Sequence, residues 1–242
     1  MFRSFRFLIL AGMALSTLLL TGLLSIEPAR SIDFTPPDRG APERVDAGGT
    51  RYAEFEIPGE RHTPVVVNGE PLECPLTAIV PQQNYGLTLR EYPTIYVHVP
   101  DLPGANLRFT LRDDKDEVLY QSRFRLGHRH GTFGISLPER ANFDPLELYR
   151  SYRWTVELVE GDESVSGAIV RVSPTEEFQN QIDRATPEEQ LQLYADTGIW
   201  YDAIDSLAAL HRNHPEDSQW MEAWREITES VELMKVGNKP LL

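Results

Sequence analysis

Hydrophobic and polar residues alternate along the middle of the chain. The segment Leu107–Asp113 reads LRFTLRD, with a hydrophobic side chain at every second position. This period of two is typical of a β-strand that buries one face. Six further short segments are rich in β-branched, aromatic and other apolar residues, mostly with the same alternation, and turn residues separate them. The seven expected strands lie within 76–81, 94–100, 107–113, 117–126, 131–138, 152–160 and 164–173.

The spacing of these segments indicates the fold class. Strands at intervals of roughly 8–12 residues, with no helices between them, are typical of an all-β sandwich, whereas a parallel α/β sheet needs crossover helices. We therefore expect a seven-stranded antiparallel β-sandwich of the immunoglobulin or fibronectin type. Tyr152 follows Leu146 by six residues, and Trp154 and Val156 continue on its strand face. It is either a corner tyrosine, hydrogen-bonded back to the preceding turn, or an ordinary core tyrosine.

The period changes from two to about 3.6 after Pro174, which predicts helices. Thr186 and Glu189 have the spacing of a capping box, with Pro187 at the first helical position, and Gly198 ends this helix. Two more helices follow, each with apolar residues on one face: Trp200, Ala203, Ile204, Leu207 and Leu210 on the second, and Trp220, Trp224, Ile227, Val231 and Met234 on the third. The expected fold is therefore α+β, a β-sandwich followed by a three-helix segment.

The N-terminal part differs from both of these regions. Arg3 and Arg6 precede an apolar run that ends at Leu24, as in an export signal or an uncleaved anchor. Residues 31–73 are rich in proline, glycine and charge, which favours an arm with one short edge strand near Val65–Val67. The expected organisation is 1–30 signal or anchor, 31–73 arm, 74–173 β-sandwich and 174–242 helical segment. We expect an exported protein, periplasmic or extracellular, that contacts the membrane only through residues 1–24 if they are not cleaved.

The charge and cysteine content narrow the classes of partner. The chain has 37 acidic and 23 basic residues and a net charge of −14. Such a surface repels phosphate groups, so we expect no nucleic-acid partner. The single cysteine, Cys74, excludes an intrachain disulfide, and its neighbours Glu73 and Pro75 give no positive charge that would activate a thiol. An inert thiol is the favoured interpretation.

Two clusters of polar residues suggest metal binding, each with a simpler alternative. His128 and His130 lie two apart in GHRHG, and a metal would need a third ligand such as His98 or His62. The alternative is a pair of solvated loop histidines. The segment DDKDE, residues 113–117, lacks the glycine of a calcium loop, so a hairpin turn is favoured. The common motifs of hydrolases, metalloproteases and nucleotide-binding enzymes do not occur, so we expect no catalytic residues and no cofactor.

The aromatic residues of the helical segment are the candidate contacts with a partner. Trp200, Tyr201, Trp220 and Trp224 could line a groove that binds a protein. Aromatic residues at helical spacing are more often part of the core, because such a stripe must be buried somewhere. Both interpretations stay open at this point.

Two resemblances add to this picture. The helical segment resembles a single tetratricopeptide repeat at Tyr194, Gly198, Trp200, Ala203, Leu207, Leu210 and Pro215, and departs from it at Pro187 and Gln190. One repeat is too small to be stable alone, so it is expected to pack on the third helix, on the sandwich or on another chain. The whole chain resembles an uncharacterised cyanobacterial family of exported proteins, a domain of unknown function. The likeness is carried by RGAPERVDAGGTR (39–51), CPLTAIVP (74–81), GLTLREYPTIYVHVP (86–100), GISLP (134–138), YRW (152–154) and GIWYDA (198–203). It implies a β-rich body, a helical end and no assigned activity.

Three functions are consistent with these features. The first hypothesis is a non-catalytic, exported interaction or scaffold module of the cell envelope that docks a protein with its helical end. The second is a sandwich that binds carbohydrate or envelope components through loop aromatics such as Tyr85, Tyr92 and Tyr149. The third is a metal-binding protein that uses His128 and His130. The sequence determines neither the ligand nor the oligomeric state.

Overall fold

The fold was examined in a computed structural model of the chain. The chain divides into two units, residues 1–30 and residues 31–242. The structure describes residues 32, 34–35, 66–67, 70–71, 74–81, 85–127, 130–140, 144–159 and 163–242, all in the second unit. The expected signal segment, His62, His128 and residues 36–65 of the arm lie outside the described residues. Among the described residues, no helix combines the length and the apolar character needed to cross a membrane.

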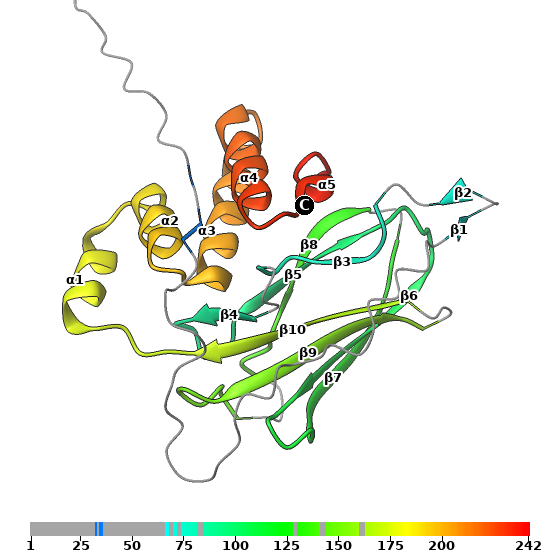
Figure 1. The fold of residues 1–242 in the computed structure, drawn as a ribbon, viewed down its shortest axis with the longest axis horizontal. Helices are drawn as coiled ribbons and strands as arrows, with labels where there is room; N and C mark the ends of the chain where they lie inside the picture. The colour runs from blue at the N-terminus through cyan, green and yellow to red at the C-terminus, as the bar shows by residue number, and fades with distance from the viewer. Residues whose placement is uncertain are drawn as a thin grey trace, which may run out of the picture. The chain divides into compact units, whose positions relative to one another are not determined.

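Two sheets form the β-rich part of the second unit (Figure 1). The larger sheet has the order β4 (Tyr85–Thr88), β10 (Ser164–Arg171), β9 (Ser151–Leu158), β6 (Asn106–Arg112) and β7 (Val118–Arg125). The smaller sheet has the order β3 (Thr77–Ala78), β5 (Thr94–Val99) and β8 (Gly131–Ser136). Phe124 of β7 and Phe133 of β8 make an edge-to-face contact, with ring centroids 5.9 Å apart. The two sheets thus pack against each other, and we call them the two-sheet body.

Every segment in which a strand was expected contains one, but the expected number and direction of strands need correction. The strand β4 was missed, and it pairs in parallel with β10, so the sheet is not antiparallel throughout. Gly86 explains both the omission and the position of this strand. A Cβ atom on Gly86 would lie 2.8 Å from Tyr201 Cε2 and 3.1 Å from Trp200 Cβ, so only glycine lets these rings approach. The short strand expected at Val65–Val67 is β1 (Val66–Val67), which pairs with β2 (Glu70–Pro71) as a separate hairpin.

Five helices follow the last strand: α1 (Glu176–Arg184), α2 (Pro187–Asp196), α3 (Trp200–Asn213), α4 (Ser218–Ser230) and α5 (Met234–Gly237). The three expected helices correspond to α2, α3 and α4. The capping box of α2 is present, since Thr186 Oγ1 accepts from Glu189 N and Glu189 Oε2 accepts from Thr186 N. The helix α1 was missed because its apolar face consists of only two residues, Phe178 and Ile182.

The expected third helix ends earlier than its apolar stripe indicates. The helix α4 stops at Ser230, and Glu232 adopts a positive φ of 62° that breaks the helical path. Met234 therefore starts α5, and 60 % of its surface is exposed. The stripe from Trp220 to Val231 is buried, whereas its expected last member is not.

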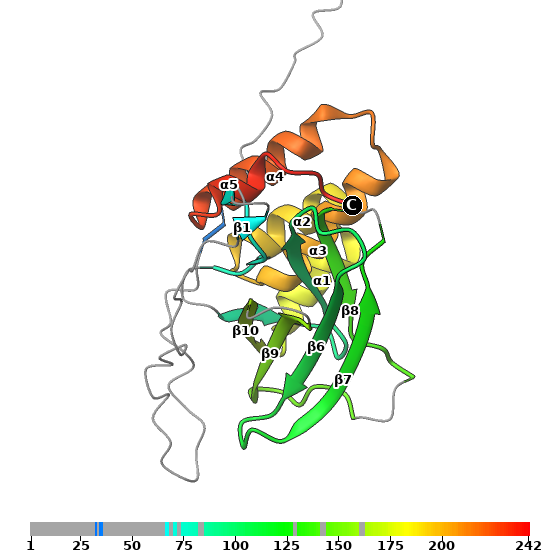
Figure 2. The ribbon, with the colours of Figure 1, turned by 90° about the vertical axis from the view of Figure 1, so that its right-hand side faces the viewer.

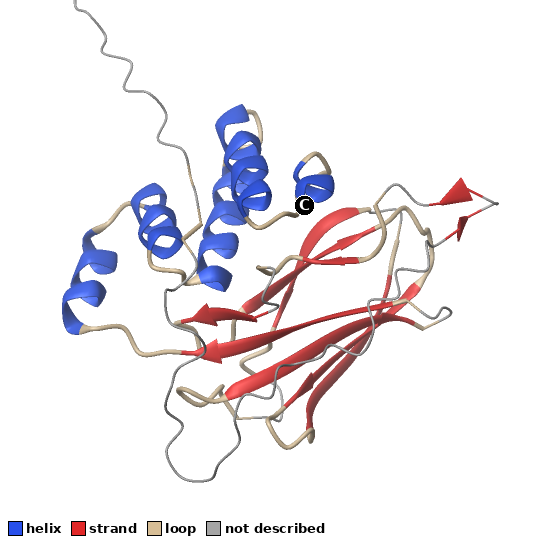
Figure 3. Ribbon diagram, in the orientation of Figure 1, coloured by secondary structure: helices blue, strands red, loops and turns tan. Residues whose placement is uncertain are grey.

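The helices cover one side of the two-sheet body, as Figures 2 and 3 show. The contact is made mainly by α3, whose Trp200 Nε1 donates to the carbonyl of Ile79 at 2.9 Å. The hydroxyl of Tyr201 accepts from Trp154 Nε1 at 2.7 Å and donates to the carbonyl of Ala168 at 3.0 Å. The tetratricopeptide-like segment therefore packs on the two-sheet body, which was one of the packing partners that the sequence left open. The sheets and helices share one hydrophobic core.

Candidate binding site at the corner before strand β9

The four aromatic residues proposed to contact a partner are all in the core. The exposed fractions are 0 % for Trp200, 2 % for Tyr201, 6 % for Trp220 and 0 % for Trp224. Phe34, which comes from the arm, packs edge-on against Trp200 with ring centroids 4.7 Å apart. The helical spacing could not separate a core stripe from a surface stripe, because both have the same period. The structure brings these residues together as packing and not as an open groove.

Of the two histidines proposed to bind a metal, His130 is described and His128 lies outside the described residues. His130 is exposed, and its Nδ1 lies 3.6 Å from Asp101 Oδ1. His98, the suggested third ligand, is buried on β5 with its Nδ1 3.4 Å from Thr132 Oγ1. Within the described part of the chain, no three His, Cys, Asp or Glu side chains gather as they would around a metal ion.

The burial of His98 predicts sensitivity to acid. Burial, with smaller contributions from the charges of Lys239 and His130, lowers the pKa of His98 from 6.5 to about 4. The neutral ring therefore stabilises the folded state above pH 6.5, and this contribution is lost as the pH falls from 6.5 toward 4. We expect the difference in unfolding free energy between the wild type and His98→Gln to shrink over this range, as measured by urea denaturation. The exposed His214→Gln is the control, and an equal pH profile for both variants would contradict the assignment.

A buried acid joins α3 to the end of β4. Asp202 Oδ2 accepts from Thr88 Oγ1 at 2.7 Å and from the amide of Leu89 at 3.2 Å, and Arg90 Nε lies 3.4 Å from Asp202 Oδ1. Arg90 also contacts Asp205, with a distance of 2.6 Å between Nη1 and Oδ2. Burial raises the pKa of Asp202, although the bonds from Thr88 and Leu89 and the charge of Arg90 oppose this.

This cluster was not found by sequence reasoning. Its residues lie in two segments that carry the family resemblance, GLTLREYPTIYVHVP and GIWYDA, and no spacing rule connects them. Both carboxylate oxygens of Asp202 already contact groups of the chain. The cluster is therefore a junction between helix and sheet, and its satisfied oxygens leave no open position for a ligand.

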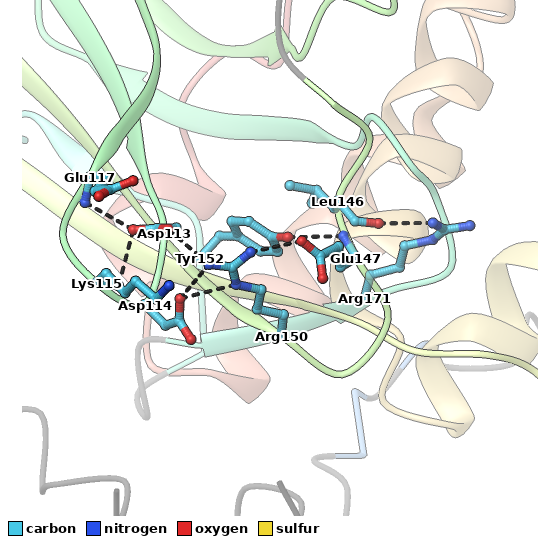
Figure 4. Close-up of polar contacts among 9 residues, drawn as sticks. All are labelled: Asp113, Asp114, Lys115, Glu117, Leu146, Glu147, Arg150, Tyr152 and Arg171. Carbon is cyan, nitrogen blue, oxygen red and sulfur yellow. Dashed lines mark hydrogen bonds and ion pairs between the residues drawn. The ribbon is translucent and has the colours of Figure 1, made fainter. Parts of the chain in front are cut away.

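The corner before β9 is fixed by hydrogen bonds on several sides (Figure 4). The hydroxyl of Tyr152 accepts from the amide of Glu147 at 2.9 Å, which favours the corner tyrosine over the ordinary core tyrosine, the two alternatives left open by the sequence. Arg171 Nη1 donates to the carbonyl of Leu146 at 2.8 Å, and the amide of Tyr149 donates to the carbonyl of Arg171 at 2.7 Å. The backbone from 146 to 149 is thus held against the end of β10.

Arg150 connects this corner to the turn between β6 and β7 (Figure 4). Its guanidinium donates to Asp113 at 2.8 Å, to Asp114 at 2.7 Å and to Glu147 at 2.7 Å. It also lies 5.7 Å from the centroid of the Tyr152 ring. A single cation therefore ties together two loops and the corner tyrosine.

The segment DDKDE forms the hairpin turn that the sequence favoured over a calcium loop. Asp113 Oδ1 accepts from the amides of Lys115 and Glu117. Burial alone would raise the pKa of Asp113, but these two hydrogen bonds and the charge of Arg150 outweigh it and hold the pKa below its usual value. The carboxylate is thus taken up by the turn and by Arg150.

The same corner presents two large apolar side chains to solvent. Leu148 is 45 % exposed and Tyr149 is 46 % exposed, and Tyr149 has a positive φ of 60°. Of the loop aromatics considered as carbohydrate contacts, Tyr85 and Tyr92 are partly buried, and Tyr149 is the exposed one. Leu148 was not singled out from the sequence, because an exposed leucine has no sequence pattern of its own. An exposed ring beside fixed carboxylates and a guanidinium can pack on one face of a ligand and exchange hydrogen bonds with its edge.

Comparison with known proteins gives a family and only weak structural likenesses. The profile of the family described as "Domain of Unknown Function (DUF928)" matches residues 49–241. No curated protein matches the chain.

Three solved structures are similar to parts of the chain. A crystal structure of S.CueP has a TM-score of 0.23 and 14 % identity, and the match covers 35 % of this chain and 57 % of that one. A putative β-galactosidase from Bacteroides fragilis has a TM-score of 0.24 and 12 % identity, and the match covers 39 % of this chain and 15 % of that one. A β-glucuronidase from Ruminococcus gnavus has a TM-score of 0.26 and 8 % identity, and the match covers 67 % of this chain and 35 % of that one. The chain spans less than two thirds of each of these relatives.

Proposed function

We propose that this chain, which belongs to the DUF928 family, is a non-catalytic exported module that binds an envelope polysaccharide at the corner before β9. The observation that carries the proposal is the state of Tyr149, which is exposed although its backbone is held in the left-handed region. For a residue other than glycine this conformation costs roughly 1–2 kcal/mol. A costly backbone conformation at a residue whose side chain is not part of the core supports a role in binding.

The surroundings of Tyr149 support a polysaccharide as the ligand. A tyrosine ring offers a flat, amphipathic surface with few rotatable bonds, so little entropy is lost on contact. The side chains of Glu147 and Asp114 are 67 % and 50 % exposed, and Arg150 fixes both. Sugar hydroxyls can donate to these carboxylates while a sugar ring packs on Tyr149. Because the acceptors are already in place, a ligand does not have to order them.

The helical end is a weaker choice for the docking surface. The surplus apolar helix faces suggested it, and among the described helices these faces pack on the two-sheet body or on each other. Export is supported by the basic and then apolar composition of residues 1–24. An immunoglobulin-like topology for the two-sheet body, and a tetratricopeptide-like packing of α2 on α3, are further parts of the proposal that the strand and helix spacings support.

Replacing Tyr149 with glycine separates binding from stability. Relief of the left-handed strain, roughly 1–2 kcal/mol, exceeds the extra backbone entropy of glycine, roughly 0.5–1 kcal/mol. We therefore expect Tyr149→Gly to raise the free energy of unfolding by about 0.5–1 kcal/mol while abolishing retention by polysaccharide in affinity gel electrophoresis. The gels would contain dextran, galactomannan or alginate.

Tyr149→Phe is the matched control, since it keeps the ring at the same position and should be retained like the wild type. A Tyr149→Gly protein that migrates like the wild type in every gel would refute the proposed site. Loss of stability in this variant would instead indicate that Tyr149 has a packing role.

A further inference from the structure

The outward face of the larger sheet carries an unusual set of side chains. On β6 and β9 the buried residues alternate with outward ones, since Phe109 and Trp154 are fully buried and point into the core. Pairing across β6, β7 and β9 extends the outward set to β7, because Phe124 lies opposite Leu107 and so shares its inward face. Five outward residues are arginines, and together we call them the arginine face: Arg108, Arg112, Arg123, Arg125 and Arg153.

Two pairs of these arginines lie directly opposite each other. Arg108 is the cross-strand partner of Arg123, and Arg112 is the cross-strand partner of Arg153. Like charges at directly opposed positions destabilise a sheet. Asp116 lies between Arg112 and Arg153, and Glu157 pairs with Arg108, so among the described residues Arg123 is the member of these pairs whose repulsion no carboxylate contact offsets.

The described carboxylates that pair with this face are fewer than its arginines. Glu157 pairs with Arg108 at 2.5 Å, and Asp116 is shared between Arg112 and Arg153. Arg125 Nε donates to the carbonyl of Gly104 at 3.3 Å. No ion pair of Arg123 with a described carboxylate is present, and its side chain is exposed. The face is thus positive on a chain whose net charge is −14.

The arginine face continues into the corner of Tyr149. The turn between β6 and β7 contacts both surfaces, because its Asp116 pairs with Arg153 while its Asp113 and Asp114 bind Arg150. Arg150 precedes Ser151, the first residue of β9, and follows Tyr149 directly. A linear ligand seated on Tyr149 can therefore extend along the sheet over the arginines.

We propose that the arginine face binds the carboxylate groups of an acidic polysaccharide whose chain also contacts Tyr149. This inference rests on the proposed function and names the class of its ligand. A guanidinium donates two parallel hydrogen bonds to a carboxylate, a geometry that lysine cannot reproduce. The exposed Gln121 and the partly buried Thr155 lie between the arginines on the same face and offer an amide and a hydroxyl group to sugar hydroxyls.

The composition of the face separates this ligand from nucleic acid. The outward positions of β6, β7 and β9 that pair across the sheet hold no aromatic side chain on which a base could stack. A polysaccharide with spaced carboxylates meets the arginines without needing stacked bases.

The test compares alginate with neutral dextran as ligands of the full chain. We expect alginate to bind more tightly than dextran, with an affinity that falls as salt is raised. The double variant Arg123→Gln/Arg125→Gln should weaken alginate binding about tenfold or more and leave dextran binding unchanged. The control Arg140→Gln/Arg184→Gln removes the same charge from exposed positions elsewhere and should bind alginate like the wild type.

The outcomes distinguish this inference from the proposed function. Equal binding of alginate by the wild type and by Arg123→Gln/Arg125→Gln would overturn the arginine face, even if Tyr149→Gly abolishes binding to both polysaccharides. Loss of alginate binding in the arginine variant, together with normal binding by Tyr149→Gly, would support carboxylate binding by the arginine face and contradict polysaccharide binding at Tyr149. Competition by single-stranded oligothymidylate at the concentration at which alginate binds would overturn the assignment to a polysaccharide. Both variant sites are exposed on an edge strand, so unchanged thermal melting is the expected check on folding.

Discussion

Replacing Trp200 with alanine is expected to lower the free energy of unfolding by about 3–5 kcal/mol. The ring is fully buried between the sheets, the helices and Phe34, and its removal leaves a cavity that Gly86 cannot fill. The carbonyl of Ile79 also loses its hydrogen bond from Trp200 Nε1. Urea denaturation followed by far-ultraviolet circular dichroism measures this change.

Trp200→Phe is the control for the packing contribution. It keeps most of the apolar volume and loses the indole N–H, so the loss should fall to about 1–3 kcal/mol, the cost of an unpaired buried carbonyl plus a small change in volume. If Trp200→Ala had the same denaturation midpoint as the wild type, α3 would not be packed on the sheets as described.

Replacing Asp202 with alanine is expected to cost about 1–3 kcal/mol, because removal of this buried acceptor leaves its hydrogen-bond donors unsatisfied. Thr88 Oγ1 and the amide of Leu89 lose their acceptor, and Arg90 keeps only Asp205 as a counter-ion. Asp202→Asn should cost clearly less, since it preserves the shape and one acceptor oxygen. Thermal and urea unfolding of both variants at pH 7 test this order.

The pH dependence of Asp202→Asn gives an independent check. Burial raises the pKa of Asp202 above its ordinary value of 3.8, so the folded state binds this proton more tightly than the unfolded state does. The stabilisation from the protonated acid is complete below pH 3.8 and is lost as the pH rises through the folded-state pKa. The stability of the wild type relative to Asp202→Asn should therefore decrease as the pH is raised from 3.8. An increase would mean that the carboxylate is stabilised, and not penalised, by its burial.

Local signals in the sequence were enough to predict most of the elements. The alternation in LRFTLRD and its counterparts located β5 to β10, because each of these strands buries one face or both. The capping box at Thr186 located the start of α2, since it depends only on residues within one turn. The sequence offered a corner tyrosine as one of two interpretations of Tyr152, and the hydrogen bond from the amide of Glu147 decides between them.

Features that depend on distant contacts were not predictable in this way. The strand β4 exists because β10 and α3 lie on either side of it, and the glycine that permits this contact removes the side chain that would mark an alternating strand. The helix α1 has only two apolar residues, Phe178 and Ile182, on its inward face, too few to identify the helix by a stripe of apolar positions. The apolar stripes that contain the tryptophans were detected, but not their burial. Trp200, for example, is buried against residues far away in the sequence, such as Ile79, which lies 121 positions earlier.

The candidate site shows the same division. Tyr149 was considered as one of three loop aromatics, and its sequence neighbours could not show that it alone of the three is exposed. The arginines of β6, β7 and β9 were visible as polar positions of separate strands. Only the register of the sheet places Arg108 opposite Arg123 and Arg112 opposite Arg153.

The junction between Thr88 and Asp202 has a consequence for how the chain acquires its structure. The two residues are 114 positions apart, and β4 finds its parallel partner only in β10. A chain emerging from the ribosome or from a translocation pore presents β4 long before either neighbour exists, and contacts of such high sequence separation form slowly. During that interval the segment needs protection from aggregation, so yield should depend on holdase chaperones in the compartment where folding takes place.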